Sequence, residues 1–199
     1  SKDRMWLGGI SGPLSCFDPD SDKFTVFKLD QVFSIAEKRP GELYLGTPSG
    51  LYTLNTYTNL ISKVIIPEQT LPQNDFKINC LSSNNGMLWI GTEKWGVIGR
   101  NIQTGEITVY DKRHGLRSQN ISTIVPESQD RIWVTTGTEL ALINTSNGKV
   151  WSFNGLGNTP AKYFNDRSGV LLQNGKITLG TAWGALVFNP SEVSPPTSQ

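Results

Sequence analysis

Short apolar segments of about four to six residues alternate with polar turns along the whole chain, and no segment shows helical periodicity over about 11 residues. Several apolar segments share one order, in which an apolar, an aromatic and a second apolar residue precede glycine or threonine. This order occurs at 5–9, 43–47, 88–92 and 132–136, and at 177–181 with threonine replacing the aromatic residue. The central residues, which we call the anchors, are Trp6, Tyr44, Trp89, Trp133 and Thr178, at spacings of 38, 45, 44 and 45 residues. Five matches at nearly one period indicate an internal repeat.

Each repeat carries three further apolar segments around its anchor segment. In the third repeat the four segments are 78–81, 88–92, 96–98 and 107–110. Asn-Gly and Thr-Gly pairs at 85–86, 104–105 and 147–148 suit the hairpin turns between such segments. A four-stranded antiparallel sheet has two apolar faces that it can bury only against neighbours. We expect the aromatic anchors Trp6, Tyr44, Trp89 and Trp133 to lie in the core, in the space between neighbouring sheets. A repeat of about 44 residues with four strands therefore predicts an all-β fold made of β-propeller blades.

The number of repeats predicts a partial propeller of roughly four and a half blades. Residues 31–66, 77–110 and 121–153 supply three complete blades, 4–28 the last three strands of one, and 161–189 the first strands of another. We expect a propeller segment over 1–190 and a linker over 191–199, where prolines gather. With an inner strand missing at one end and an outer strand at the other, the segment is predicted to belong to a larger ring or to pair with another segment.

The repeat resembles the two-component regulator propeller repeat, in which an Asn-x-Val-x-x-Ile strand precedes Leu-Trp-Ile-Gly-Thr and a Gly-Leu strand. Residues 115–124 with 131–136, and residues 88–92, carry the closest matches, while Thr178 and Thr135 depart from the pattern. The resemblance extends over essentially the whole chain.

This resemblance implies the periplasmic sensor region of a Bacteroidetes hybrid two-component receptor with a histidine kinase elsewhere in its chain. Members of the family recognise oligosaccharides and control glycan-utilisation genes. The implied partners are an oligosaccharide, a second copy in a homodimer and the remainder of the same receptor chain, and the segment itself is expected not to be an enzyme. A propeller-fold lyase or glycosidase, and a purely structural or dimerisation module, remain as alternatives.

Charge and composition narrow the function further. Lys and Arg total 18 against 17 Asp and Glu, so binding of nucleic acid through bulk charge is not expected. No apolar run reaches about 18 residues, so we expect no membrane insertion by this segment. Cys16 and Cys80 are too few for a disulfide framework and lie at positions where the other repeats have apolar or small residues. We therefore predict that Cys16 is buried, that Cys80 fills a small-residue position on an inner strand, and that the two form no disulfide.

The sequence offers little catalytic chemistry. His114 is the single histidine, no nucleophile-elbow motif accompanies it, metal-ligating residues do not cluster, and no pair of carboxylates can be assigned. We therefore predict no catalytic residue, no metal and no cofactor.

The candidate ligand-binding residues lie in loops that a propeller places on one rim. Trp95 and Trp183 follow their anchors by five or six residues, between the second and third strands of their blades, and a tryptophan face can stack on a sugar ring. Polar and basic residues of the blade-to-blade loops would share this rim. The candidates are Trp95, Trp183, Arg113, His114, Arg117 and Tyr163. The alternative for each is packing, for the tryptophans, or simple solvation, for the charged residues.

Overall fold

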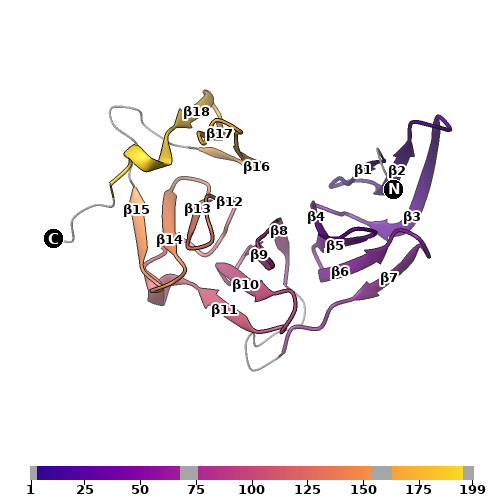
Figure 1. Ribbon diagram of the computed structural model, residues 1–199, viewed down its shortest axis with the longest axis horizontal. Helices are drawn as coiled ribbons and strands as arrows, with labels where there is room; N and C mark the ends of the chain where they lie inside the picture. Colours follow the sequence, from indigo (N-terminus) through magenta and orange to yellow (C-terminus); the bar gives the residue numbers. More distant parts are fainter. Residues whose placement is uncertain (1–3, 68–75, 154–162, 195–199) are drawn as a thin grey trace.

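The computed structural model describes residues 4–67, 76–153 and 163–194, which form five antiparallel sheets (Figure 1). The first sheet contains β1 (Met5–Leu7), β2 (Pro13–Asp18) and β3 (Lys23–Asp30). The second contains β4 (Ser34–Arg39), β5 (Glu42–Thr47), β6 (Gly50–Asn55) and β7 (Leu60–Lys63). The third contains β8 (Ile78–Asn84), β9 (Met87–Thr92), β10 (Val97–Asn101) and β11 (Ile107–Tyr110). The fourth contains β12 (Thr123–Pro126), β13 (Arg131–Thr135), β14 (Leu140–Asn144) and β15 (Val150–Phe153), and the fifth β16 (Phe164–Leu171), β17 (Ile177–Thr181) and β18 (Gly184–Phe188).

The strands of each sheet pair in chain order, so each sheet is a meander. Two single-turn 3-10 helices, Lys112–His114 and Pro190–Glu192, are the only helices within the described residues, and neither is long enough to cross a membrane. The predicted all-β chain of antiparallel sheets with three or four strands is confirmed.

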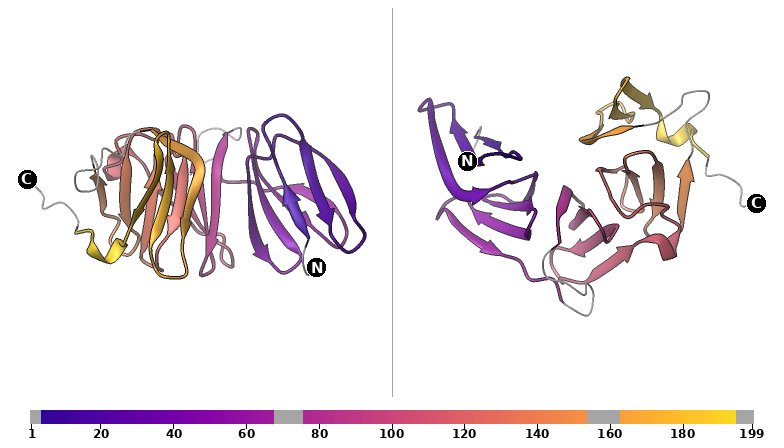
Figure 2. Two further views of the ribbon diagram at one scale, coloured as in Figure 1. Left: turned by 90° about the horizontal axis from the view of Figure 1, so that it is seen from above. Right: turned by 180° about the vertical axis from the view of Figure 1, so that it is seen from behind.

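The sheets follow one another around an arc (Figures 1 and 2). The first strands of four sheets, β4, β8, β12 and β16, lie at the centre of the arc, and contacts join each of them to the next. The last strands, such as β7, β11 and β15, lie at the periphery. The two end sheets do not meet, so the arc stays open between β1–β3 and β16–β18.

The core consists of four apolar clusters, one between each pair of successive sheets. Tyr44, Trp89 and Trp133 are buried, as predicted for the anchors, and each faces the following sheet. In the second to fifth sheets, the residue after the anchor faces the preceding sheet, because successive side chains of a strand point to opposite faces. These residues, Leu45, Ile90, Val134 and Leu179, are 0–1% exposed. One strand therefore fills two clusters.

Glycine follows the anchor by two residues because the inner strand of the sheet approaches closely there. A Cβ at Gly91 would lie 2.3 Å from Sγ of Cys80 and 2.9 Å from Cγ2 of Ile121. The threonine after this glycine caps the next turn: the hydroxyl of Thr92 donates to the Gly96 carbonyl at 3.0 Å, and that of Thr181 to the Gly184 carbonyl at 3.0 Å. The Gly-Thr pair of the repeat is therefore a packing and turn signal.

Both cysteines are buried free thiols, and the burial of Cys16 is as predicted. Burial raises the pKa of the Cys80 thiol to about 12, so it is not a nucleophile at neutral pH.

Candidate functional site

The loops that join second to third strands lie beside the loops that join successive sheets, and we call this edge of the arc the loop rim. Hydrogen bonds tie the two kinds of loop together. The Gly96 N–H donates to the Gln119 carbonyl at 3.0 Å, and the Ala182 N–H donates to the Tyr163 carbonyl at 2.9 Å. The Phe164 N–H donates to the Gly137 carbonyl at 3.2 Å, which links the fifth sheet to the fourth. The rim is therefore continuous from the third sheet to the fifth.

Arg113 and His114 are held by one carboxylate, that of Asp111. Asp111 caps the 3-10 helix, and its Oδ1 accepts from the Arg113 N–H at 2.9 Å and lies 3.0 Å from His114 Nδ1. Arg113 Nε donates to Oδ2 at 2.8 Å. The guanidinium holds the pKa of Asp111 at about 2, below its ordinary 3.8. Arg113 stays exposed, but part of its hydrogen-bonding capacity is already used.

Arg117 lies above a carboxylate that the sequence did not single out as a binding residue, that of Glu139. Arg117 Nε is 3.8 Å from Glu139 Oε1, too far for a hydrogen bond. Glu139 is buried, and neither of its oxygens has a hydrogen-bond partner within the described part of the chain. Its place in the repeat is that of Gly50, Gly96 and Gly184, so the loss of glycine was the available signal for an unusual rim position.

Tyr163 and Trp183 are exposed aromatic residues in two neighbouring loops of the fifth sheet. Trp183 is 82% exposed and Tyr163 is 57% exposed, and the Tyr163–Ala182 hydrogen bond holds their loops together. Tyr163 has a φ of 63°, a conformation that non-glycine residues seldom adopt. These two residues offer the largest uncovered aromatic area among the candidates.

Trp95 differs from Trp183 although the two share a place in the repeat. Its backbone N–H donates to the Thr92 hydroxyl at 2.8 Å, and its half-buried side chain packs against the cluster that contains Tyr44 and Ile98. A neighbouring sheet supplies that cluster for Trp95, whereas Trp183 lies on the end sheet. The structure thus gives Trp95 a packing role and leaves the Trp183 side chain exposed.

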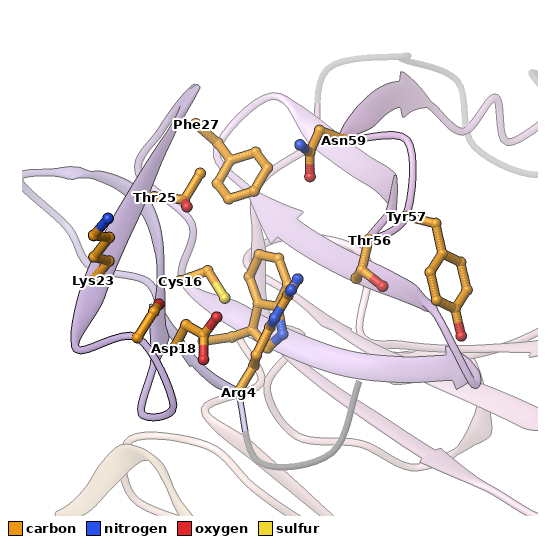
Figure 3. Close-up of a pocket in the computed structure, with 11 residues that line it drawn as sticks. Arg4, Cys16, Asp18, Lys23, Thr25, Phe27, Thr56, Tyr57 and Asn59 are labelled. Atoms are coloured by element: carbon orange, nitrogen blue, oxygen red, sulfur yellow. The ribbon is translucent and has the colours of Figure 1, made fainter.

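A cavity of about 480 Å³ lies beside the anchor Trp6, between the first and second sheets (Figure 3), and none of the six predicted residues lines it. Figure 3 shows the Arg4 and Asp18 side chains on one side of this cavity and Thr56, Tyr57 and Asn59 on the other.

Trp6 is half-buried, whereas the sequence predicted a core residue at every aromatic anchor. The other aromatic anchors each have an inner strand beside them in the sheet, since Ala36 pairs with Tyr44, Ser82 with Trp89 and Val125 with Trp133. Within the described residues no strand pairs with the inner edge of β1, the edge that β2 leaves free. In that part of the chain Trp6 therefore has one neighbouring strand fewer than the other aromatic anchors, which leaves it more exposed than they are.

The sequence matches no family model and no curated protein. Solved structures are similar, and two of them come from B. thetaiotaomicron, each described as the extracellular domain of a hybrid two-component system. One gives a TM-score of 0.76 at 19% identity and covers 96% of this chain and 28% of its own. The other gives 0.75 at 20% identity and covers 94% and 26%.

The WD40 repeats of RRP9 are also similar, with a TM-score of 0.65, 16% identity, and coverage of 89% of this chain and 56% of RRP9. The chain spans little more than a quarter of the two bacterial proteins. At these identities the likeness concerns the fold. Over nearly its whole length, the chain shares the fold of a part of the extracellular domains of hybrid two-component systems.

Proposed function

We propose that the arc is part of a β-propeller whose ring is completed by further sheets on the outer faces of both end sheets. Leu7 supports this proposal. It occupies the repeat position of Leu45, Ile90, Val134 and Leu179, yet it is 41% exposed where they are 0–1% exposed. Met5, Phe24 and Val26 are exposed with it on the same face of the first sheet. An exposed apolar face of this kind is typical of a surface that packs against another sheet. The WD40 repeats of RRP9, a class of repeat that forms propellers, share the fold of this chain.

We infer that this propeller segment belongs to the periplasmic, ligand-sensing region of a hybrid two-component receptor. The observation that carries the inference is the likeness of almost the whole chain to two extracellular domains of such systems. In this function the segment is not an enzyme. Its partners are the remainder of the receptor chain and a second receptor copy in a homodimer.

The proposed ligand is an oligosaccharide that binds on the loop rim. Trp183 and Tyr163 supply aromatic faces for the apolar C–H side of a pyranose ring. Arg117, with the buried Glu139 carboxylate beneath it, supplies polar groups for sugar hydroxyls. Arg113 and His114 flank this group in the loop before β12.

Binding would act on the kinase by shifting a population of receptor conformations. A ligand moves such an equilibrium only by its difference in affinity between the two states. The loop rim suits this requirement because its loops connect successive sheets, so a ligand that bridges two loops favours one relative placement of the sheets.

The test is intrinsic tryptophan fluorescence of the chain against a panel of defined oligosaccharides. We expect a saturable change with at least one glycan, and we expect Trp183→Ala or Tyr163→Ala to weaken it about tenfold or more. Tyr57→Ala is the matched control, because Tyr57 is an exposed tyrosine on the opposite edge of the arc. A flat response to every glycan, or full binding by Trp183→Ala, would remove the rim as the site.

A further inference from the structure

The loop-rim end of the central opening gathers two cations on one aromatic ring. Phe33 immediately precedes β4 of the second sheet, Lys77 immediately precedes β8 of the third, and Arg167 lies in β16 of the fifth. The Arg167 guanidinium carbon is 5.5 Å from the centroid of the Phe33 ring, and Lys77 Nζ is 5.8 Å from the same centroid. Three sheets therefore converge on a half-buried phenyl ring at the centre of the arc.

The two cations differ in whether a carboxylate pairs with them. Lys77 Nζ lies 2.8 Å from Glu93 Oε1, and this hydrogen bond lowers the pKa of Glu93. Arg167 is exposed and makes no ion pair with any carboxylate in the described residues, Asp166 included. The N–H donors of a guanidinium lie in its own plane, so a guanidinium that rests on an aromatic face can still donate hydrogen bonds from its edge. Arg167 is thus the open donor of this group.

A β-bulge places Arg167 in this position. The register of β16 against β17 shifts between Phe164 and Gly169, and Arg167 has a φ of 54°. Bulges re-aim side chains, and a non-glycine residue at positive φ is unfavourable unless its surroundings impose it. Here the Arg167 N–H donates to the Ser122 carbonyl at 2.9 Å, and the Ser168 N–H donates to the Thr123 hydroxyl at 3.1 Å. The fourth sheet holds the bulge so that the guanidinium crosses the opening.

We propose that Arg167, assisted by Lys77 and with Phe33 as an apolar floor, binds an oxyanion group of a ligand at the centre of the arc. The group is a carboxylate or a sulfate, because the planar guanidinium fork matches two oxygens and Lys77 adds a second positive charge. This site uses none of the six residues predicted for the rim, and the proposal holds whether or not the rim binds a neutral sugar.

Calorimetric titration of the chain with D-glucuronate, D-glucose and inorganic sulfate tests the proposal. Glucuronate and glucose share a ring, so we expect glucuronate to bind at least tenfold more tightly, with an affinity that falls as salt is added. Tighter binding of glucuronate than of sulfate identifies a carboxylated ligand, and the reverse order identifies a sulfated one. Absence of binding by both anions overturns the proposal.

The variants separate a binding role from a structural one. Arg167→Gln should weaken the anion about tenfold or more, and Lys77→Gln should weaken it less, since Glu93 already occupies Lys77. Arg39→Gln, at the opposite end of the inner strands, should bind as the parent does. Arg167→Gly should also lose the anion while melting no lower than the parent, because glycine tolerates the positive φ. Unchanged anion affinity in Arg167→Gln and Arg167→Gly would overturn the proposed oxyanion site, even if the rim binds oligosaccharides.

Discussion

The indole Nε1 of Trp133 donates a 2.7 Å hydrogen bond to Oε2 of Glu127, which also accepts from Arg131 Nε at 3.0 Å. Trp133 is fully buried between the fourth and fifth sheets, where its ring lies 5.0 Å from that of Phe188 and 5.4 Å from that of Phe153. One residue thus joins the apolar cluster to a charged group at the end of the inner strand. The hydrogen bond gives the indole N–H a partner, which a buried donor needs.

Replacing Trp133 by phenylalanine should therefore lower the free energy of unfolding by about 1–3 kcal/mol, because the variant loses packing volume and the hydrogen bond to Glu127. Urea unfolding followed by circular dichroism measures the change. Trp183→Phe is the matched control, and it should fall within about 0.5 kcal/mol of the parent since Trp183 is exposed. Equal effects of the two substitutions would contradict the assignment of Trp133 to the core.

Gly91→Ala should destabilise the chain by about 1–3 kcal/mol, because the new methyl group meets Cys80 Sγ and Ile121. Adding Cys80→Ala should recover part of the loss by removing the nearer atom. Thermal unfolding of the single and double variants measures both effects. Gly137→Ala is the control, because no atom lies within 4 Å of the Cβ position there. A silent Gly91→Ala would show that the third and fourth sheets pack less closely than the structure has them.

Leu7 and Leu45 share a repeat position, but Leu7 lies on the exposed face of the first sheet and Leu45 lies in the core. We expect Leu45→Ala to cost about 2–5 kcal/mol of stability, as for a large buried side chain, and Leu7→Ala to cost less than about 1 kcal/mol. Denaturant unfolding of the two variants makes the comparison. In a chain that carries the proposed adjacent sheet, Leu7→Ala should cost more, approaching the cost of Leu45→Ala. If Leu7→Ala costs as little in the longer chain, no sheet covers this face.

Asp111 should make stability depend on pH in the acid range. Its pKa is held at about 2 in the folded chain, chiefly by the Arg113 guanidinium, against 3.8 ordinarily. A depressed folded pKa stabilises the fold above the unfolded value, so this contribution is present above about pH 4 and disappears as the pH falls toward 2. Asp111→Asn should therefore shrink the loss of melting temperature between pH 5 and pH 2.5. Asp20→Asn, at an exposed turn position, should leave that loss unchanged, and an identical loss in Asp111→Asn would refute the role of this carboxylate.

Local patterns in the sequence predicted most of the fold. The anchor segment predicts an alternating strand, its Gly-Thr ending predicts a close approach and a turn, and the period predicts sheets that repeat. These features depend on contacts within one sheet, where strands that follow each other in the chain also pair. The structure therefore places strands where the pattern does, including the incomplete first and last sheets.

Only the tertiary structure decided what each equivalent residue does. Trp95 and Trp183 share a repeat position, but one packs against a neighbouring sheet and the other projects from an end sheet. Trp6 and Trp133 share the anchor position, but only Trp133 has an inner strand beside it. Repeat position alone contains no information on which neighbours are present.

The group at the centre of the arc shows the same limit. Phe33, Lys77 and Arg167 belong to three different sheets and to no motif, and a bulge that Ser122 and Thr123 hold in place brings Arg167 to the ring. The sequence by itself determined the strands, the turns and the burial of the anchors Tyr44, Trp89 and Trp133, because these follow from alternation over a few positions. The meeting of side chains across the opening followed from the angle between successive sheets and from one local irregularity, which only the folded chain defines.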